Sequence, residues 1–282
     1  MTDSRFRSAA GGQRVRAEYT RLLAEYLPEV TRTVVDGTHV LSAGPAGAPP
    51  VLLLHGSGGT SLNWAAEIPA LAATRRVHAI DLPGEPGGTV VERLPLEPGT
   101  HAAWLAGVAD ALDVQRATVI GESLGGWVAL DYASAHPSRV TTLGLLVPGG
   151  LGPRRIAPLF VAGLLSLLGE PGRRRAMSYF TGWHPSGSPG LESDLAAFSG
   201  LVFRAFAPRT DGLPEFDDAT LAAVTAPVTA VFGARDRMLD GRKGAARARA
   251  AFGDASVTVE PDGGHLLPDR LARVMAAAGA DD

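Results

Sequence analysis

Residues 117–126 read Ala-Thr-Val-Ile-Gly-Glu-Ser-Leu-Gly-Gly, and this stretch decides the fold of the chain. Its apolar half, 117–120, predicts a buried strand, and residues 127–132 predict a helix. A Gly-x-Ser-x-Gly turn between a strand and a helix bends the chain sharply and holds the serine hydroxyl clear of the backbone. The helix N-terminus adds a field that favours developing negative charge. Ser123 is therefore the predicted nucleophile, and the alternative is a glycine-rich turn in which the serine is incidental.

Short apolar runs recur on both sides of this turn and predict buried, mostly parallel strands. Helical patterns separate them, which is typical of a doubly wound α/β sheet whose functional residues gather beyond the carboxyl ends of the strands. A helix and an antiparallel hairpin precede this core, the hairpin being marked by an Asp-Gly turn. The expected strands are 31–35, 39–41, 51–54, 77–80, 117–120, 140–147, 228–232 and 257–259, and the main expected helices are 10–27, 100–112 and 125–135.

The domain organisation follows from one interruption of this pattern. Residues 152–214 contain no clear strand and mix apolar helical stretches with Gly, Pro and Arg, which predicts a helical lid inserted into the sheet domain. The expected division is an N-terminal helix at 1–28, an α/β core at 29–151 and 215–282, and the lid between them. The last residues, 276–282, are expected to fray.

A second glycine-rich loop, His-Gly-Ser-Gly-Gly at residues 55–59, directly follows a predicted strand. Acyl transfer needs donors aimed at the oxyanion, and backbone N–H groups in such a loop supply them without reorganisation. The two predicted donors are the N–H groups of Ser57 and of Leu124, the residue after the nucleophile, with Gly58 as the next candidate. Gly58, Trp127 and Leu164 are also predicted to contact the substrate.

The base and the acid are expected later in the chain, in the order Ser, acid, His. His265 follows the last predicted strand in Asp-Gly-Gly-His, and Asp236 lies just beyond the strand before it. The 29 residues between them (265 − 236) leave room for one helix and one strand. A carboxylate at Asp236 would orient the imidazole and stabilise the imidazolium. Asp240 and Asp262 are competing candidates, for which a helix-capping or solvated role is expected instead.

Three other polar residues near these motifs are expected to be structural. His55 precedes the turn that carries the nucleophile, Asp81 ends a strand and is expected to cap the turn at 82–84, and Glu122 is expected to pack or hydrogen-bond locally.

Composition excludes several function classes. The 282 residues are 45% hydrophobic and 20% charged with a formal net charge of −3, which argues against nucleic-acid binding. The chain has no cysteine, and no metal-ligand cluster, phosphate loop or dinucleotide fingerprint is found. We expect no cofactor, no metal and no membrane span, a small-molecule substrate, a monomer or homodimer, and a cytoplasmic location.

Together these motifs resemble the α/β-hydrolase superfamily over about residues 30–280. Within it, the chain is similar to bacterial carboxylesterase-type serine hydrolases, and also to carbon–carbon bond hydrolases that act on meta-cleavage products. The resemblance implies an α/β-hydrolase fold and cleavage of a small, largely apolar carboxylic ester by Ser123, His265 and Asp236. The alternatives are carbon–carbon cleavage with the same residues, cofactor-free haloperoxidase chemistry, and a non-hydrolytic ligand-binding or biosynthetic accessory protein on the same fold.

Overall fold

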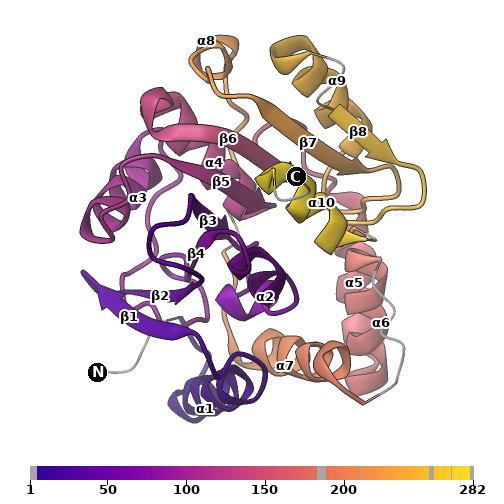
Figure 1. Ribbon diagram of the computed structural model, residues 1–282. Helices are drawn as coiled ribbons and strands as arrows, with labels where there is room; N and C mark the ends of the chain where they lie inside the picture. The colour runs from indigo at the N-terminus through magenta and orange to yellow at the C-terminus, as the bar shows by residue number, and fades with distance from the viewer. Residues whose placement is uncertain (1–4, 183–188, 210, 254–256, 268, 280–282) are drawn as a thin grey trace.

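The computed structural model describes residues 5–182, 189–209, 211–253, 257–267 and 269–279, which form an eight-stranded sheet covered by helices on both faces (Figure 1). The sheet order is β1-β2-β4-β3-β5-β6-β7-β8, with β1 and β2 antiparallel to their neighbours and all later pairs parallel. The strands are β1 (Thr31–Val35), β2 (Thr38–Ala43), β3 (Pro50–Leu54), β4 (Arg76–Ile80), β5 (Ala117–Glu122), β6 (Val140–Leu146), β7 (Val228–Gly233) and β8 (Val257–Glu260).

The central strands are apolar because both faces of the sheet are covered. Leu52 and Leu54 of β3 face one hydrophobic cluster, whereas Val51 and Leu53 of the same strand face the other. A strand buried on both sides needs a continuous apolar run, and this is why the predicted runs are found as strands. The predicted mostly parallel, doubly wound α/β sheet is confirmed.

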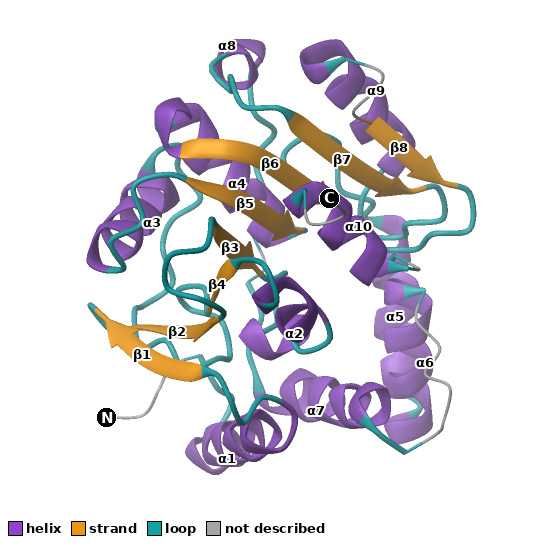
Figure 2. Ribbon diagram, in the orientation of Figure 1, coloured by secondary structure: helices purple, strands orange, loops and turns teal. Residues whose placement is uncertain are grey.

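Helices form the two outer layers (Figure 2). The first hydrophobic cluster lies between the sheet and α3, α4, α8 and α9, and the second lies between the sheet and α1, α2 and α10. The helices outside the insert described next are α1 (Ala9–Tyr26), η1 (Ser61–Trp64), α2 (Glu67–Ala72), α3 (Thr100–Ala111), α4 (Leu124–Ala135), η2 (Pro137–Arg139), α8 (Asp218–Ala222), α9 (Gly241–Phe252) and α10 (Arg270–Ala278).

Three helices, α5 (Ala157–Ser166), α6 (Gly169–Thr181) and α7 (Leu191–Ala205), form an insert between β6 and β7. Within its described part the insert contains no strand, as expected for 152–214. α7 packs along α1, where the Tyr26 hydroxyl donates to Asp194 Oδ2 at 2.9 Å and the Phe198 side chain is buried (Figure 1). The last helix of the insert is therefore anchored to the helix that precedes the sheet.

The end of the chain corrects one expectation. Residues 276–278 do not fray: they form the last turn of α10, and Ala277 and Ala278 are buried. α10 lies close against β6 because Gly144 has no side chain, and a methyl group there would lie 2.9 Å from Ala277 Cβ. Residues 280–282, also part of that expectation, lie outside the described residues.

Candidate active site

Ser123 stands at the bend between β5 and α4 with φ 53° and ψ −110°, a strained backbone conformation for a residue with a side chain. The glycines around it are required by close approaches. A methyl group on Gly121 would lie 2.2 Å from the carbonyl oxygen of Gly125, and one on Gly125 would lie 2.1 Å from the carbonyl oxygen of Leu54. The strand, the turn and the helix are thus pressed together, and the strain at Ser123 is held in place by its neighbours.

The structure brings Ser123, His265 and Asp236 together. His265 Nε2 lies 3.0 Å from Ser123 Oγ, and His265 Nδ1 lies 2.8 Å from Asp236 Oδ2. Asp236 follows β7 and His265 follows β8, so the three side chains come from loops at the carboxyl edge of the sheet. All three are buried, with exposed fractions of 8%, 6% and 1% for Ser123, His265 and Asp236.

The second oxygen of Asp236 fixes the carboxylate. Asp236 Oδ1 accepts the backbone N–H groups of Met238 at 2.7 Å and of Leu239 at 3.1 Å. Because both donors are backbone groups, the carboxylate cannot rotate freely, and Oδ2 stays directed at the imidazole. This contact requires the proton on His265 Nδ1 and leaves Nε2 as an acceptor facing Ser123.

The electrostatics of His265 favour its protonated form. Burial alone lowers the pKa of the imidazole, but the carboxylates of Asp236 and Glu122 outweigh it and leave the pKa raised. Glu122 itself faces α10, where Arg270 Nη2 lies 3.6 Å from its Oε2.

The two competing carboxylates lie elsewhere, as expected. Asp240 caps α9, accepting the N–H of Lys243 at 3.2 Å. Asp262 is exposed and pairs with Arg235 at 2.6 Å.

The loop at residues 55–59 lies against Ser123: a methyl group on Gly56 would be 3.4 Å from Ser123 Cβ. Within the described part of the chain, no hydrogen bond engages the N–H of Ser57, and Leu124 opens α4, so its N–H has no partner within the helix. Gly58 differs from Ser57, because its N–H donates to Glu85 Oε2 at 2.6 Å. Gly58 is therefore not available as an oxyanion donor. The space beside its Cα atom is open, since a methyl group there would meet nothing within 4 Å.

Contact of Trp127 with a substrate stays a prediction, and the structure places this residue in the core. Its side chain is fully buried in the core, stacked on Phe216 at 5.1 Å between ring centroids, and its Nε1–H donates to the carbonyl of Pro214. Position 127 lies one turn into α4, on a face that packs against the chain before α8. Leu164 lies on α5 and is 68% exposed, and its contact with a substrate stays a prediction.

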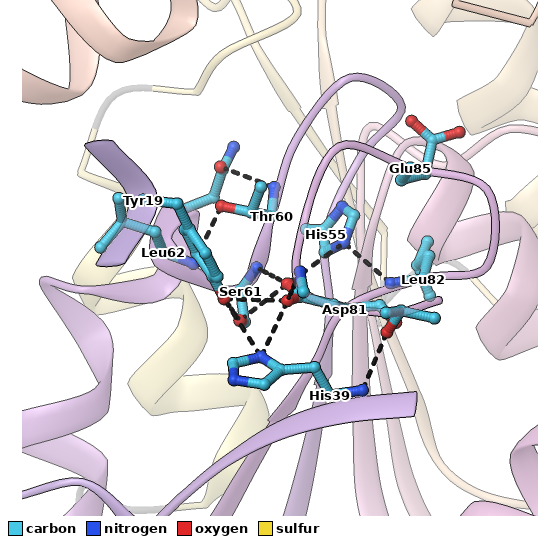
Figure 3. A network of polar contacts seen from close by, with 12 residues as sticks. Tyr19, His39, His55, Thr60, Ser61, Leu62, Asp81, Leu82 and Glu85 are labelled. Carbon is cyan, nitrogen blue, oxygen red and sulfur yellow. Dashed lines mark hydrogen bonds and ion pairs between the residues drawn. The ribbon is translucent and has the colours of Figure 1, made fainter. Parts of the chain in front are cut away.

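Sequence reasoning missed a buried polar network centred on Asp81 (Figure 3). Asp81 does not cap the turn at 82–84. Its Oδ2 accepts from the Tyr19 hydroxyl at 2.8 Å and the Gly88 N–H at 2.7 Å and contacts His39 Nδ1 at 3.0 Å, and its Oδ1 accepts the N–H and hydroxyl of Ser61. These partners come from α1, β2, η1 and the loop after β4. A carboxylate at a strand end was the only signal in the sequence, and it does not reveal partners so distant in the chain.

His55 lies beside this network and is fully buried, which agrees with a structural role. Its Nε2 accepts the N–H of Leu82 at 3.0 Å, so its proton is on Nδ1, which donates to the carbonyl of Gly56 at 2.8 Å. Burial lowers the pKa of His55, in spite of the nearby Asp81, and keeps the ring neutral.

Among the described residues, no group of three or more His, Cys, Asp or Glu side chains is placed to hold a metal ion. No helix in the described ranges has the length and apolar character needed to cross a membrane.

The chain is similar in sequence to known hydrolases. The chain is 27% identical over 242 residues to an uncharacterised carboxylesterase of Bacillus subtilis, which covers 82% of this chain and 77% of the relative. It is 32% identical over 214 residues to a 2-hydroxy-6-oxononadienedioate/2-hydroxy-6-oxononatrienedioate hydrolase of Cupriavidus pinatubonensis, covering 69% and 73% of the two chains.

The fold is similar to that of naproxen esterase from Bacillus subtilis, with a TM-score of 0.79, 24% identity, and 94% and 97% of the two chains covered. Residues 51–278 match the sequence model described as the alpha/beta hydrolase family, a span that runs from β3 to the end of α10 and includes all three side chains at the carboxyl edge. The chain belongs to the alpha/beta hydrolase family.

Proposed function

We propose that the chain is a serine esterase that cleaves small, largely apolar carboxylic esters through an acyl-enzyme. The observation that carries this proposal is the continuous chain of contacts from Ser123 Oγ to His265 Nε2 at 3.0 Å and from His265 Nδ1 to Asp236 Oδ2 at 2.8 Å. A serine hydroxyl becomes nucleophilic only when a base accepts its proton, and here the base is within hydrogen-bond distance and its tautomer is fixed.

The reaction has two halves. In the first, His265 accepts the proton of Ser123 while Oγ attacks the ester carbonyl, and the resulting imidazolium then protonates the leaving alcohol. In the second, His265 deprotonates a water molecule that attacks the acyl-enzyme, and the proton returns to Ser123 Oγ as the acid leaves. Asp236 orients the imidazole and stabilises the imidazolium.

The N–H groups of Ser57 and Leu124 are the proposed oxyanion donors. Both are free of partners in the described structure, and both flank Ser123, one from the loop after β3 and one from the first residue of α4. The start of α4 adds the positive end of the helix dipole at the same place. An oxygen that becomes negatively charged beside Ser123 is stabilised by these groups without any rearrangement.

The ester class is supported by the relatives that carry that name. The Bacillus subtilis relatives at 27% and 26% identity are both carboxylesterases, each covering 82% of this chain. The apolar preference is supported by α5, whose sequence Ala-Pro-Leu-Phe-Val-Ala-Gly-Leu-Leu-Ser has no charged side chain and follows directly on the loop after β6. This insert is the proposed lid.

Carbon–carbon bond cleavage is the second candidate, because the Cupriavidus pinatubonensis hydrolase is 32% identical to this chain. It would use the same three side chains. A vinylogous diketone substrate that is bleached rapidly, with nitrophenyl esters left intact, would favour this candidate. Fast ester cleavage with an unchanged dienol would exclude it.

A fluorophosphonate probe tests the proposed function directly. The probe forms an adduct with a serine only when the base and the oxyanion donors are assembled, and peptide mass spectrometry locates it. We expect an adduct at Ser123 that is absent in Ser123→Ala, together with a loss of several orders of magnitude in kcat for nitrophenyl esters. Folded protein that is not labelled would contradict the proposal and favour a non-hydrolytic role, and unchanged hydrolysis in Ser123→Ala would refute the mechanism.

A further inference from the structure

Glu85 is a fully buried carboxyl group that the mechanism above does not use. It lies in the loop after β4, and its Oε2 accepts the N–H of Gly58 at 2.6 Å. Its Oε1 is also buried, and no group in the described part of the chain donates to it. A buried carboxyl is costly to maintain, and the Gly58 N–H is the strongest of the interactions that offset this cost, ahead of the charges of Arg93 and Arg209 and the side chain of Ser57.

The contact falls beside a proposed oxyanion donor. Two peptide groups flank Ser57, and each is held by one buried side chain. The carbonyl of Gly56, in the peptide that carries the Ser57 N–H, accepts from His55 Nδ1 at 2.8 Å and from the N–H of Gly59 at 3.0 Å. The N–H of Gly58, in the next peptide, is held by Glu85. Together these contacts fix the direction in which the Ser57 N–H points.

Both of these restraints depend on the same short segment after β4. Leu82 donates to His55 Nε2 at 3.0 Å, and Glu85 lies three residues later, with its side chain directed away from the Asp81 network in Figure 3. Arg5 donates to the backbone carbonyl of Glu85 at 3.0 Å. Asp81 anchors the far end of this loop by accepting the N–H of Gly88 at 2.7 Å. The backbone of Glu85, whose side chain accepts the Gly58 N–H, is therefore held by Arg5, and the loop that carries it is held by Asp81.

We propose that Glu85 is a positioning residue for ester cleavage: its carboxyl oxygen holds the Gly58 N–H and thereby aims the Ser57 N–H at the oxyanion. This inference rests on the proposed esterase function and assigns a role in it to a residue that does not touch the substrate. What matters is an acceptor at this point, because a negative charge close to a developing oxyanion would by itself oppose the reaction.

The environment of the carboxyl fits this role. Burial raises the pKa of Glu85 to about 7, although the Gly58 N–H and the guanidinium groups of Arg93 and Arg209 lower it. Since the group is poorly solvated, water is a poor substitute for the contact with Gly58. A neutral amide of the same length retains an acceptor oxygen at the same place.

Three variants separate geometry from charge. Glu85→Gln keeps the acceptor and removes the charge, and we expect kcat for nitrophenyl esters within about threefold of the wild type. Glu85→Leu removes the acceptor, and Glu85→Asp keeps the charge but is one methylene too short. For both we expect kcat to fall by about tenfold or more with KM nearly unchanged, since loss of one oxyanion donor costs roughly 10²–10³ in kcat. Asp131→Asn is the matched control: this buried carboxylate accepts the N–H groups of Gly99 and Ala102, away from Ser123.

A second measurement follows the contact itself. The amide proton of Gly58, observed by NMR in the intact protein, should lie downfield in the wild type and in Glu85→Gln, and should move upfield in the Leu and Asp variants. The unfolding midpoint of each variant checks that it folds. If Glu85→Leu does not fold, the comparison of Asp with Gln decides the question.

The outcomes distinguish the two proposals. If the wild type hydrolyses no ester, the esterase proposal fails and the role of Glu85 in it fails as well. If the wild type is active and Glu85→Leu and Glu85→Asp retain its kcat, the role of Glu85 alone is overturned. A parallel loss of kcat in Glu85→Gln would also overturn it, because charge and not the acceptor would then matter.

Discussion

Replacing Tyr19 by phenylalanine removes one oxygen atom from the network that ties α1 to the core. The Tyr19 hydroxyl is buried, donates to Asp81 Oδ2 at 2.8 Å and lies 2.7 Å from Ser61 Oγ. The ring itself stacks on Phe198 of α7 with centroids 6.2 Å apart, and phenylalanine preserves that contact. The substitution therefore tests the hydrogen bonds and leaves the packing almost unchanged.

The expected cost is about 2 kcal/mol of unfolding free energy. A hydrogen bond to a charged group contributes roughly 1.5–3 kcal/mol. The lower part of that range applies, because Asp81 Oδ2 keeps the Gly88 N–H and His39, and Ser61 Oγ still donates to Asp81 Oδ1 at 2.8 Å. Loss of a single oxygen leaves no cavity large enough to add a substantial packing term.

Urea unfolding followed by circular dichroism measures this cost, with Tyr132→Phe as the control. Tyr132 is also a buried side chain, and none of the hydrogen bonds found within the described structure involves its hydroxyl. We expect Tyr132→Phe to change the unfolding free energy by less than about 0.5 kcal/mol. A loss below that value in Tyr19→Phe as well would refute the reasoning, since the network would then contribute nothing that water does not supply.

Three further predictions concern the charges and close approaches of the site. Asp81→Asn should cost about 3 kcal/mol of unfolding free energy at pH 7. Burial raises the pKa of Asp81, but its partners outweigh this effect and lower the pKa to about 2. The stabilisation is therefore present above the unfolded pKa of about 3.9, and in urea titrations it should disappear as the pH falls toward 2. Glu122→Gln should move the acid limb of kcat/KM to lower pH. Burial lowers the pKa of His265, but nearby carboxylates, including Glu122, outweigh it and raise that pKa, and the proposed base acts only when neutral. An unmoved limb would contradict that electrostatic role. Gly125→Ala should lower the free energy of unfolding by about 3 kcal/mol or more, since its methyl would lie 2.1 Å from a carbonyl oxygen of β3. The control Gly107→Ala, in open space on α3, should not destabilise the protein.

The sequence was sufficient to predict that Ser123, Asp236 and His265 lie together, because each stands in the turn or loop after a predicted strand. Parallel strands end at the same edge, so residues 142 positions apart, Ser123 and His265, are brought into contact by strand topology alone. The same argument separated Asp236 from Asp240, which lies four residues further along and begins a helix.

The contacts that sequence reasoning missed have a different origin. Tyr19 and Asp81 are 62 residues apart and meet because α1 packs on one face of the sheet, which no local pattern specifies. The burial of Trp127 has a related origin, because its place near the start of α4 does not indicate which face of that helix meets the core. Glu85 lies in a Gly- and Pro-rich loop whose path depends on backbone contacts with distant residues such as Arg5.

The sheet order explains why the loop after β4 connects these two kinds of contact. β3 lies between β4 and β5, so the loop that leaves β3 at residue 55 is flanked on one side by Ser123 and on the other by the segment that begins with Asp81. Ser123 is held by the close packing of its own glycines, but the glycine-rich loop at 55–59 has few side chains with which to fix itself. Besides the bond between Gly59 and Gly56, its restraints come from the neighbouring loop, through Leu82 and Glu85. That loop is in turn fixed by Asp81 and its partner Tyr19 on α1. Precision at the proposed oxyanion site is thus a property of the contact between two adjacent loops and the helix that precedes the sheet.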